Sequence, residues 1–260
     1  MIRASALDER GGPELGIAHR LRARSPRAVA VAVAVFGYVA LTLLLVGFGL
    51  ILTRLLIPGP VGAWDNSVNE WFAAHRTPIW NTATDYASIL AGTGTVLIIA
   101  GATAVILATR RLWREIGFLL VAFFIEFSTF LTTVLLIERP RPTVVRLDGV
   151  PATSSFPSGH VAAAIVLYAG LAILISSHTR HRVIRVAVWA IAVTFVIGVG
   201  VSRVYRGLHH PIDVFAGVII GIAALFFAIL AIRAAGVASH ERAESGSETP
   251  ITRQRSEVRS

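Results

Sequence analysis

Long apolar blocks alternate with short arginine-bearing stretches along most of the chain. Four of the blocks reach the roughly 20 residues that a helix needs to cross a bilayer, and two more come close. The pattern predicts spanning helices at about 28–53, 87–108, 116–137, 160–176, 186–201 and 211–232. Together these helices leave no room for a second folded domain of ordinary size. We therefore expect an all-α, polytopic membrane protein with six transmembrane helices in one bundle.

The remaining segments divide the chain into three parts. Residues 1–27 are polar and basic and are interpreted as a cytoplasmic arm, residues 28–235 as the membrane domain, and residues 236–260 as a disordered cytoplasmic tail rich in Ser, Glu and Arg. Within the domain, the mixed segment 56–86 contains three tryptophans, Trp64, Trp71 and Trp80. Tryptophan at this spacing is typical of a segment that lies at the membrane interface.

Composition excludes a soluble globular enzyme and a disordered chain, since 55% of the 260 residues are hydrophobic and only 15% are charged. The net charge is +9, and every basic residue is Arg. Because these arginines lie between apolar blocks, they indicate membrane topology rather than nucleic-acid binding. There is no Cys, and hence no disulfide, thiol nucleophile or Cys-based metal site. The arginine-only usage and the Ala/Val richness suggest a GC-rich bacterial genome.

Arginine counts predict the orientation of the bundle. The N-terminus, the 110–114 loop, the 178–185 loop and the tail lie on one side and carry most of the arginines, which predicts that this side is cytoplasmic. The loops 54–86, 138–159 and 202–210 then face outward. Five of the seven arginines on that outer side fall in the last two loops, where topology does not account for them.

Three polar clusters lie at helix ends on the predicted outer face. They are Glu138–Pro142 after the third span, Pro157–His160 before the fourth, and Ser202–Asp213 between the fifth and sixth. Each cluster alone has a structural explanation, as a basic turn, a helix cap and a capping interaction. Helix topology nevertheless brings all three loops to one face, and intramembrane-edge arginines and histidines are usually retained for function. Together they predict a functional site.

The residue types in these clusters suit a phosphate. Arg141 and Arg203 supply forked donors that match phosphate oxygens. Ser158 and Gly159 begin a helix, where free N–H groups favour an anion and glycine permits close approach. The cradle so formed contains no metal.

Two histidines from different loops, His160 and His209, would lie within this cradle. Asp213 follows His209 by about one helical turn, so its carboxylate can accept a proton from one imidazole nitrogen and leave the other free to attack phosphorus. The second histidine can protonate the departing oxygen.

The clusters resemble the three signature motifs of the type 2 phosphatidic acid phosphatase family, which also includes the vanadium haloperoxidases. The second motif, Pro-Ser-Gly-His, is complete at residues 157–160, and the third is complete at Ser202, Arg203, His209 and Asp213. The resemblance extends over about residues 65–232. It implies metal-independent hydrolysis without a cofactor.

The resemblance also implies a role for each site residue. His209 would be the nucleophile that forms a phosphohistidine, Asp213 would orient it and His160 would protonate the leaving group. The phosphate would be bound by the remaining motif residues, Arg141, Ser158, Gly159 and Arg203. His210 matches no motif position and is interpreted as a neighbour.

The first motif departs from the family pattern, because Val134 stands where the family has Lys. Either a nearby arginine (Arg139, Arg146 or Arg206) replaces that lysine, or the site holds phosphate less tightly. One lost charged hydrogen bond is worth about 1.5–3 kcal/mol.

Glu126 is an acidic residue in the middle of the third predicted span. Measured along the axis of that predicted helix, it lies on the order of 20 Å from Arg141. It could contact substrate or conduct protons, but a hydrogen bond to Ser, Thr or Tyr of a neighbouring helix is the favoured interpretation.

The leading hypothesis is a membrane lipid-phosphate phosphatase with its site at the extracytoplasmic surface. The resemblance implies undecaprenyl pyrophosphate, phosphatidic acid and phosphatidylglycerol phosphate as candidate substrates, with membrane lipids as the surroundings. The alternative is a protein that binds or transports a lipid phosphate without hydrolysing it. A haloperoxidase is the third hypothesis, and six spans disfavour it.

Overall fold

The chain is described here by a computed structural model that covers residues 13, 16, 25–149 and 153–247. Within these residues the regular structure is entirely helical, which confirms the all-α prediction. In chain order the helices are α2 (Pro26–Ile51), α3 (Pro60–Ala74), α4 (Pro78–Leu90), α5 (Thr93–Thr109), α6 (Trp113–Leu136), α7 (Gly159–Ala164), α8 (Gly170–His178), α9 (Arg182–Tyr205) and α10 (Pro211–Ser247). Two π-helical turns, η1 (Leu52–Leu56) and η2 (Ile165–Ala169), extend α2 and join α7 to α8.

Five continuous helical stretches are long and apolar enough to cross a membrane, and a sixth results if α4 and α5 form one span. These two helices meet at a bend of 45°. The bend falls inside the predicted span 87–108, at the sequence Ala-Gly-Thr-Gly, where Gly92 caps the start of α5 in an extended conformation. The protein is therefore a multi-pass membrane protein with five or six spans.

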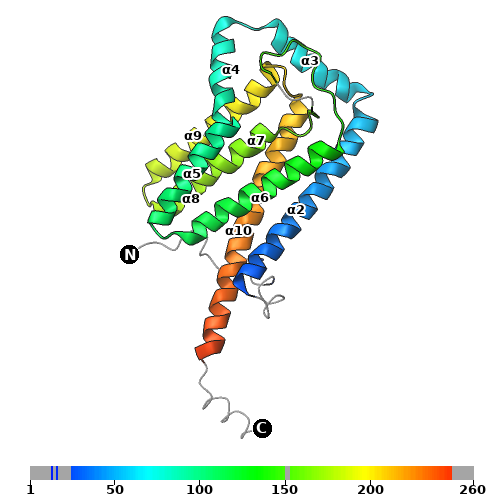
Figure 1. The fold of residues 1–260 in the computed structure, drawn as a ribbon. Coiled ribbons are helices and arrows are strands. Elements are labelled where there is room, and N and C mark those ends of the chain that lie inside the picture. Colours follow the sequence, from blue (N-terminus) through cyan, green and yellow to red (C-terminus); the bar gives the residue numbers. More distant parts are fainter. Residues whose placement is uncertain (1–12, 14–15, 17–24, 150–152, 248–260) are drawn as a thin grey trace.

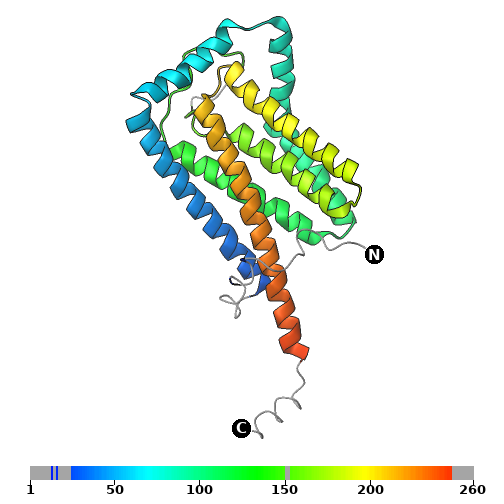
Figure 2. The same ribbon diagram turned by 180° about the vertical axis from the view of Figure 1, so that it is seen from behind.

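α10 is the central helix of the bundle and packs against α2, α6 and α7, while α9 packs against α4 and α8 (Figures 1 and 2). Small residues let α10 approach its neighbours closely, as expected between membrane helices. A Cβ on Gly217 would lie 2.4 Å from the carbonyl oxygen of Ser158. Gly217 therefore allows the loop before α7 to rest directly on α10.

One end of the bundle carries α3 together with the loops 137–158 and 206–210, at the top of Figure 1. Proline is the first residue of both α3 and α4: Gly59 precedes Pro60, and the Thr77 side chain caps the helix that Pro78 begins. Trp64, Trp71 and Trp80 are all exposed. The segment predicted to lie at the interface is thus folded as two short helices rather than as an irregular loop.

The predicted disorder of the tail is wrong for residues 236–247. α10 continues to Ser247 and projects beyond the rest of the bundle at the end opposite α3 (Figure 1). Extension of an existing helix needs no new nucleus, and this stretch contains Ala, Glu and Arg, which favour helix. Residues 248–260 and nearly all of the predicted N-terminal arm lie outside the described residues, so the domain boundaries at 27 and 235 stay predictions.

Candidate active site

The third motif forms the connection between α9 and α10. Arg203 lies in the last turn of α9, and its carbonyl oxygen accepts hydrogen bonds from the backbone N–H groups of Leu208 and His209. Gly207 adopts a φ of +72°, a left-handed conformation that side chains disfavour. This tight reversal sets His209 between the two helices, and Pro211 then starts α10.

His209 is buried, and its Nδ1 lies 2.6 Å from the carbonyl oxygen of Ser155. Because a carbonyl oxygen only accepts, Nδ1 carries the proton and Nε2 is left as a free electron pair. Nε2 makes no hydrogen bond within the described part of the chain. Burial lowers the pKa of His209, which further favours the neutral imidazole.

Asp213 does not hold His209 in the way the sequence predicts. Its Oδ2 lies 3.8 Å from Nδ1 of His209, too far for a hydrogen bond. The same oxygen accepts the backbone N–H of His210 at 2.9 Å and lies 3.4 Å from the ring nitrogen Nδ1 of that residue. The backbone carbonyl of Ser155 therefore takes the position expected for the Asp213 carboxylate, and His210 is its closer histidine.

A buried ion-pair chain connects Asp213 to α3. The guanidinium of Arg139 bridges the carboxylates of Asp213 and Asp65. Asp65 also accepts the backbone N–H of Ile212 at 3.2 Å. Sequence reasoning missed Asp65, although an aspartate in a segment otherwise suited to the interface was the available signal.

A second set of contacts closes the other side of the site. Arg206 donates to Asp148 through Nε at 2.7 Å and lies 3.0 Å from Asp85 of α4. These hydrogen bonds raise the pKa of Arg206 and lower that of Asp148. Arg141 donates to the carbonyl oxygen of Leu208 at 2.7 Å. The loop 137–158 is therefore fastened to the third motif at several points.

Three donors that the sequence assigns to a phosphate have no hydrogen-bond partner. They are Oγ of Ser158, Nε of Arg141 and Nε of Arg203, and all three atoms are buried. Buried polar atoms are usually paired, so these three donors are available to a ligand or to water. Burial also lowers the pKa of Arg141, the shift expected for a cation that lacks an anionic partner.

The two remaining motif residues, Gly159 and His160, begin α7. A Cβ on Gly159 would lie 2.7 Å from the ring of Phe130 on α6, so this glycine makes room for a side chain as well as for any ligand. His160 is half-buried and lies within electrostatic range of Arg141, Arg203 and His209.

Val134 stands where the family pattern has a phosphate-binding lysine, and the arginines that carboxylates hold do not replace that charge. Arg139 is fixed between Asp65 and Asp213, and Arg206 is fixed by Asp148. Arg146 is exposed on the loop. This arrangement favours the alternative in which phosphate is held less tightly.

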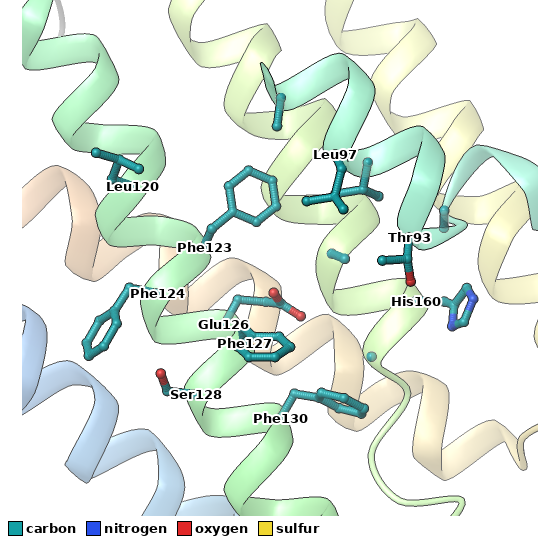
Figure 3. Close-up of a pocket in the computed structure, with 15 residues that line it drawn as sticks. Thr93, Leu97, Leu120, Phe123, Phe124, Glu126, Phe127, Ser128, Phe130 and His160 are labelled. Atoms are coloured by element: carbon teal, nitrogen blue, oxygen red, sulfur yellow. The ribbon is translucent and has the colours of Figure 1, made fainter. Parts of the chain in front are cut away.

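A pocket of about 700 Å³ opens from the site between α5, α6 and α7. Most of its lining is apolar, and the polar exceptions are Thr93, Glu126, Ser128 and His160 (Figure 3). Glu126 makes no hydrogen bond or ion pair with any residue in the described ranges, so the predicted bond to a Ser, Thr or Tyr of a neighbouring helix is not formed.

The fold and site together define a helical membrane protein with a buried histidine and unpaired buried donors at one end of its bundle. Residues 115–236 match the PAP2 superfamily. The resemblance carried by the motifs is thereby confirmed.

Two curated relatives and one solved structure are similar to the chain. The chain is 36% identical over 97 residues to phosphatidylglycerophosphatase B of Bacillus subtilis, and the matched region covers 36% of this chain and 45% of the relative. It is 32% identical over 129 residues to undecaprenyl-diphosphatase of Sulfolobus acidocaldarius, and the matched region covers 46% of this chain and 56% of the relative. The chain thus spans about half the length of the curated relatives it matches.

The solved structure is a transmembrane PAP2-type phosphatidylglycerolphosphate phosphatase from Bacillus subtilis. It superposes with a TM-score of 0.62 at 25% identity, over 74% of this chain and 94% of that one. The bundle is therefore similar in fold to that of this membrane PAP2-type protein.

Proposed function

We propose that this protein is an integral membrane phosphatase that hydrolyses a lipid phosphate or pyrophosphate through a phosphohistidine intermediate. The observation that carries the proposal is the group of buried, unpaired donors on Ser158, Arg141 and Arg203 beside a histidine with a free Nε2. Forked guanidinium donors and a hydroxyl match the oxygens of a phosphate. The names of the curated relatives, both phosphatases of lipid substrates, support the same class.

The proposed reaction is an in-line displacement in two steps. In the first, Nε2 of His209 attacks phosphorus and the bond from phosphorus to the leaving oxygen breaks, while His160 gives that oxygen a proton. In the second, His160 takes a proton from water, the water oxygen attacks phosphorus, and the bond to His209 breaks to release phosphate. Throughout, the Ser155 carbonyl keeps the proton of His209 on Nδ1.

The other residues would act on charge and position. Arg141 and Arg203 would stabilise the negative charge on the phosphoryl oxygens, with the Ser158 hydroxyl and the backbone of Gly159 as further donors. Asp213 would act mainly through His210 and the backbone at the start of α10, since its carboxylate contacts those groups.

The apolar pocket supports a lipid as substrate, because it begins at His160 and continues between membrane helices. Soluble phosphate esters need no such space. We place the site at the extracytoplasmic surface, and the termini in the cytoplasm, from the arginines at 110–114 and 180–185 at the opposite end. The absence of Cys permits a direct test: a Cys introduced at exposed Arg146 should react with an impermeant maleimide added outside cells, and a Cys at exposed Arg111 should not.

The decisive experiment is phosphate release by purified protein in detergent from undecaprenyl pyrophosphate, phosphatidic acid and phosphatidylglycerol phosphate. Each is assayed with EDTA and with the His209→Ala variant. Release that persists in EDTA and is lost in the variant supports the proposal, as does an acid-labile phosphoenzyme trapped by rapid quenching. Lipid binding without release by the unmodified protein would instead favour the non-hydrolytic alternative, for which Val134 is the one supporting observation.

A further inference from the structure

Glu126 lies in the middle of α6 and has no role in the steps above. Its side chain is only 4% exposed, and it lacks a hydrogen-bond or ion-pair partner in the described residues. It nevertheless lines the pocket that begins at His160, and Figure 3 shows its carboxyl pointing into that space. An ionisable group within a membrane helix is costly and is usually tied to function.

The depth of Glu126 relative to the site follows from the register of α6. Phe130 lies four residues after Glu126, on the same helix face and about 6 Å further along the axis. The ring of Phe130 in turn contacts Gly159 at the start of α7. Glu126 therefore lies about one helical turn deeper than the phosphate-binding residues, much nearer than its separation from Arg141 along the chain suggests.

The surroundings of Glu126 leave its hydrogen-bonding capacity unused. Phe123, Phe127 and Leu97 line the pocket near it and offer no polar atom. A neutral carboxylic acid has one donor and retains acceptor capacity, and leaving such a group unpaired in an apolar site is unfavourable. A ligand that enters the pocket can supply the missing partner in place of water.

We infer that Glu126 hydrogen-bonds the glycerol-ester region of a glycerolipid phosphate and so makes the enzyme selective for ester-linked lipid phosphates. This inference rests on the proposed function. A glycerolipid carries ester carbonyl groups within a few bonds of its phosphate, at the depth of Glu126. A polyprenyl chain carries only hydrocarbon there, so it would bury the carboxyl without a partner.

The test compares three substrates in detergent: dioleoyl phosphatidic acid, its dialkyl ether analogue, which lacks the carbonyl oxygens, and a polyprenyl diphosphate. The unmodified enzyme should have a kcat/KM about tenfold higher for the ester than for the ether. Glu126→Leu should bring this ratio close to one and leave polyprenyl diphosphate hydrolysis unchanged or faster. Glu126→Gln, which keeps a donor, should preserve the ratio, and so should Ser128→Ala, which removes a different polar group of the pocket.

An ester-to-ether ratio near one in the unmodified enzyme would overturn the inference without recourse to any variant. An equal loss on all three substrates in Glu126→Leu would also overturn it, since that result marks a structural role. Both outcomes leave the proposed phosphatase activity intact. The absence of release from every substrate by the unmodified enzyme would instead contradict the proposed function itself.

Discussion

The ion-pair chain Asp65–Arg139–Asp213 gives a quantitative prediction about stability. The side chains of the two aspartates are fully buried, and that of Arg139 is 2% exposed, so water cannot replace a lost partner. Removal of one partner from a buried pair costs about 3–5 kcal/mol. We therefore predict that Asp65→Asn lowers the free energy of unfolding by about 3 kcal/mol, at the lower end because an Asn oxygen can still accept the N–H of Ile212.

The same contacts predict strong coupling between substitutions. Arg139→Gln leaves both carboxylates without a cation and should lower the free energy of unfolding by more than Asp65→Asn does. The double variant leaves only Asp213 uncompensated. Its loss should be smaller than the sum of the single losses by about 2–3 kcal/mol.

Reversible unfolding in mixed detergent micelles, followed by tryptophan fluorescence, measures these free energies. Arg146→Gln is the matched control, since it removes an exposed arginine from the same loop and should change stability by no more than about 0.5 kcal/mol. If Asp65→Asn behaves like this control, or if the single losses simply add, the reasoning about the buried chain is refuted.

Three further predictions concern catalysis. Burial lowers the pKa of His209 below the ordinary value of about 6.5, so kcat/KM should stay constant as the pH falls through that value. A decrease of kcat/KM centred at or above pH 6.5 would argue against His209 as the neutral nucleophile. Val134→Lys should raise kcat/KM about tenfold, because residue 134 lies one turn beyond Phe130 on the face of α6 that is turned toward the site. An unchanged kcat/KM would mean that another group already supplies this positive charge. Ser158→Ala should lower kcat/KM about tenfold, and unfolding measurements should show no loss of stability because its Oγ has no hydrogen-bond partner. A loss of stability with unchanged kcat/KM would assign the hydroxyl a structural role.

Hydropathy was sufficient to predict most of the fold. The spans of α6 and α9 were placed within a few residues, because a lipid-facing helix needs an uninterrupted apolar stretch. The bend between α4 and α5 was not anticipated, since Gly92 changes the helix direction without interrupting the apolar run. The extension of α10 to Ser247 was missed because the polar composition of the tail shows that it is solvated, but does not show whether an existing helix continues into it.

The site was predictable where side chains identify their own chemistry. Arg203, His209 and Asp213 are recognisable by type and spacing, and short loops fix the end of the bundle at which they lie. The pairing of Asp65 could not be predicted, since its partner Arg139 is 74 residues away in the chain. The hydrogen bond from His209 to Ser155 was equally hidden, because any residue type supplies a backbone carbonyl.

The arginines of the site differ in how closely carboxylates hold them. Arg139 and Arg206 form short ion pairs with carboxylates, and their contacts join the loops to α3 and α4. Arg141 instead donates to the backbone carbonyl of Leu208, and the Asp148 carboxylate lies 4.0 Å from Arg203. The Nε atoms of Arg139, Arg141 and Arg203 are all buried without a hydrogen-bond partner. The close ion pairs of Arg139 and Arg206 therefore hold the site together, whereas the less closely paired Arg141 and Arg203 are the arginines better able to respond to the negative charge that develops on a phosphoryl group during transfer.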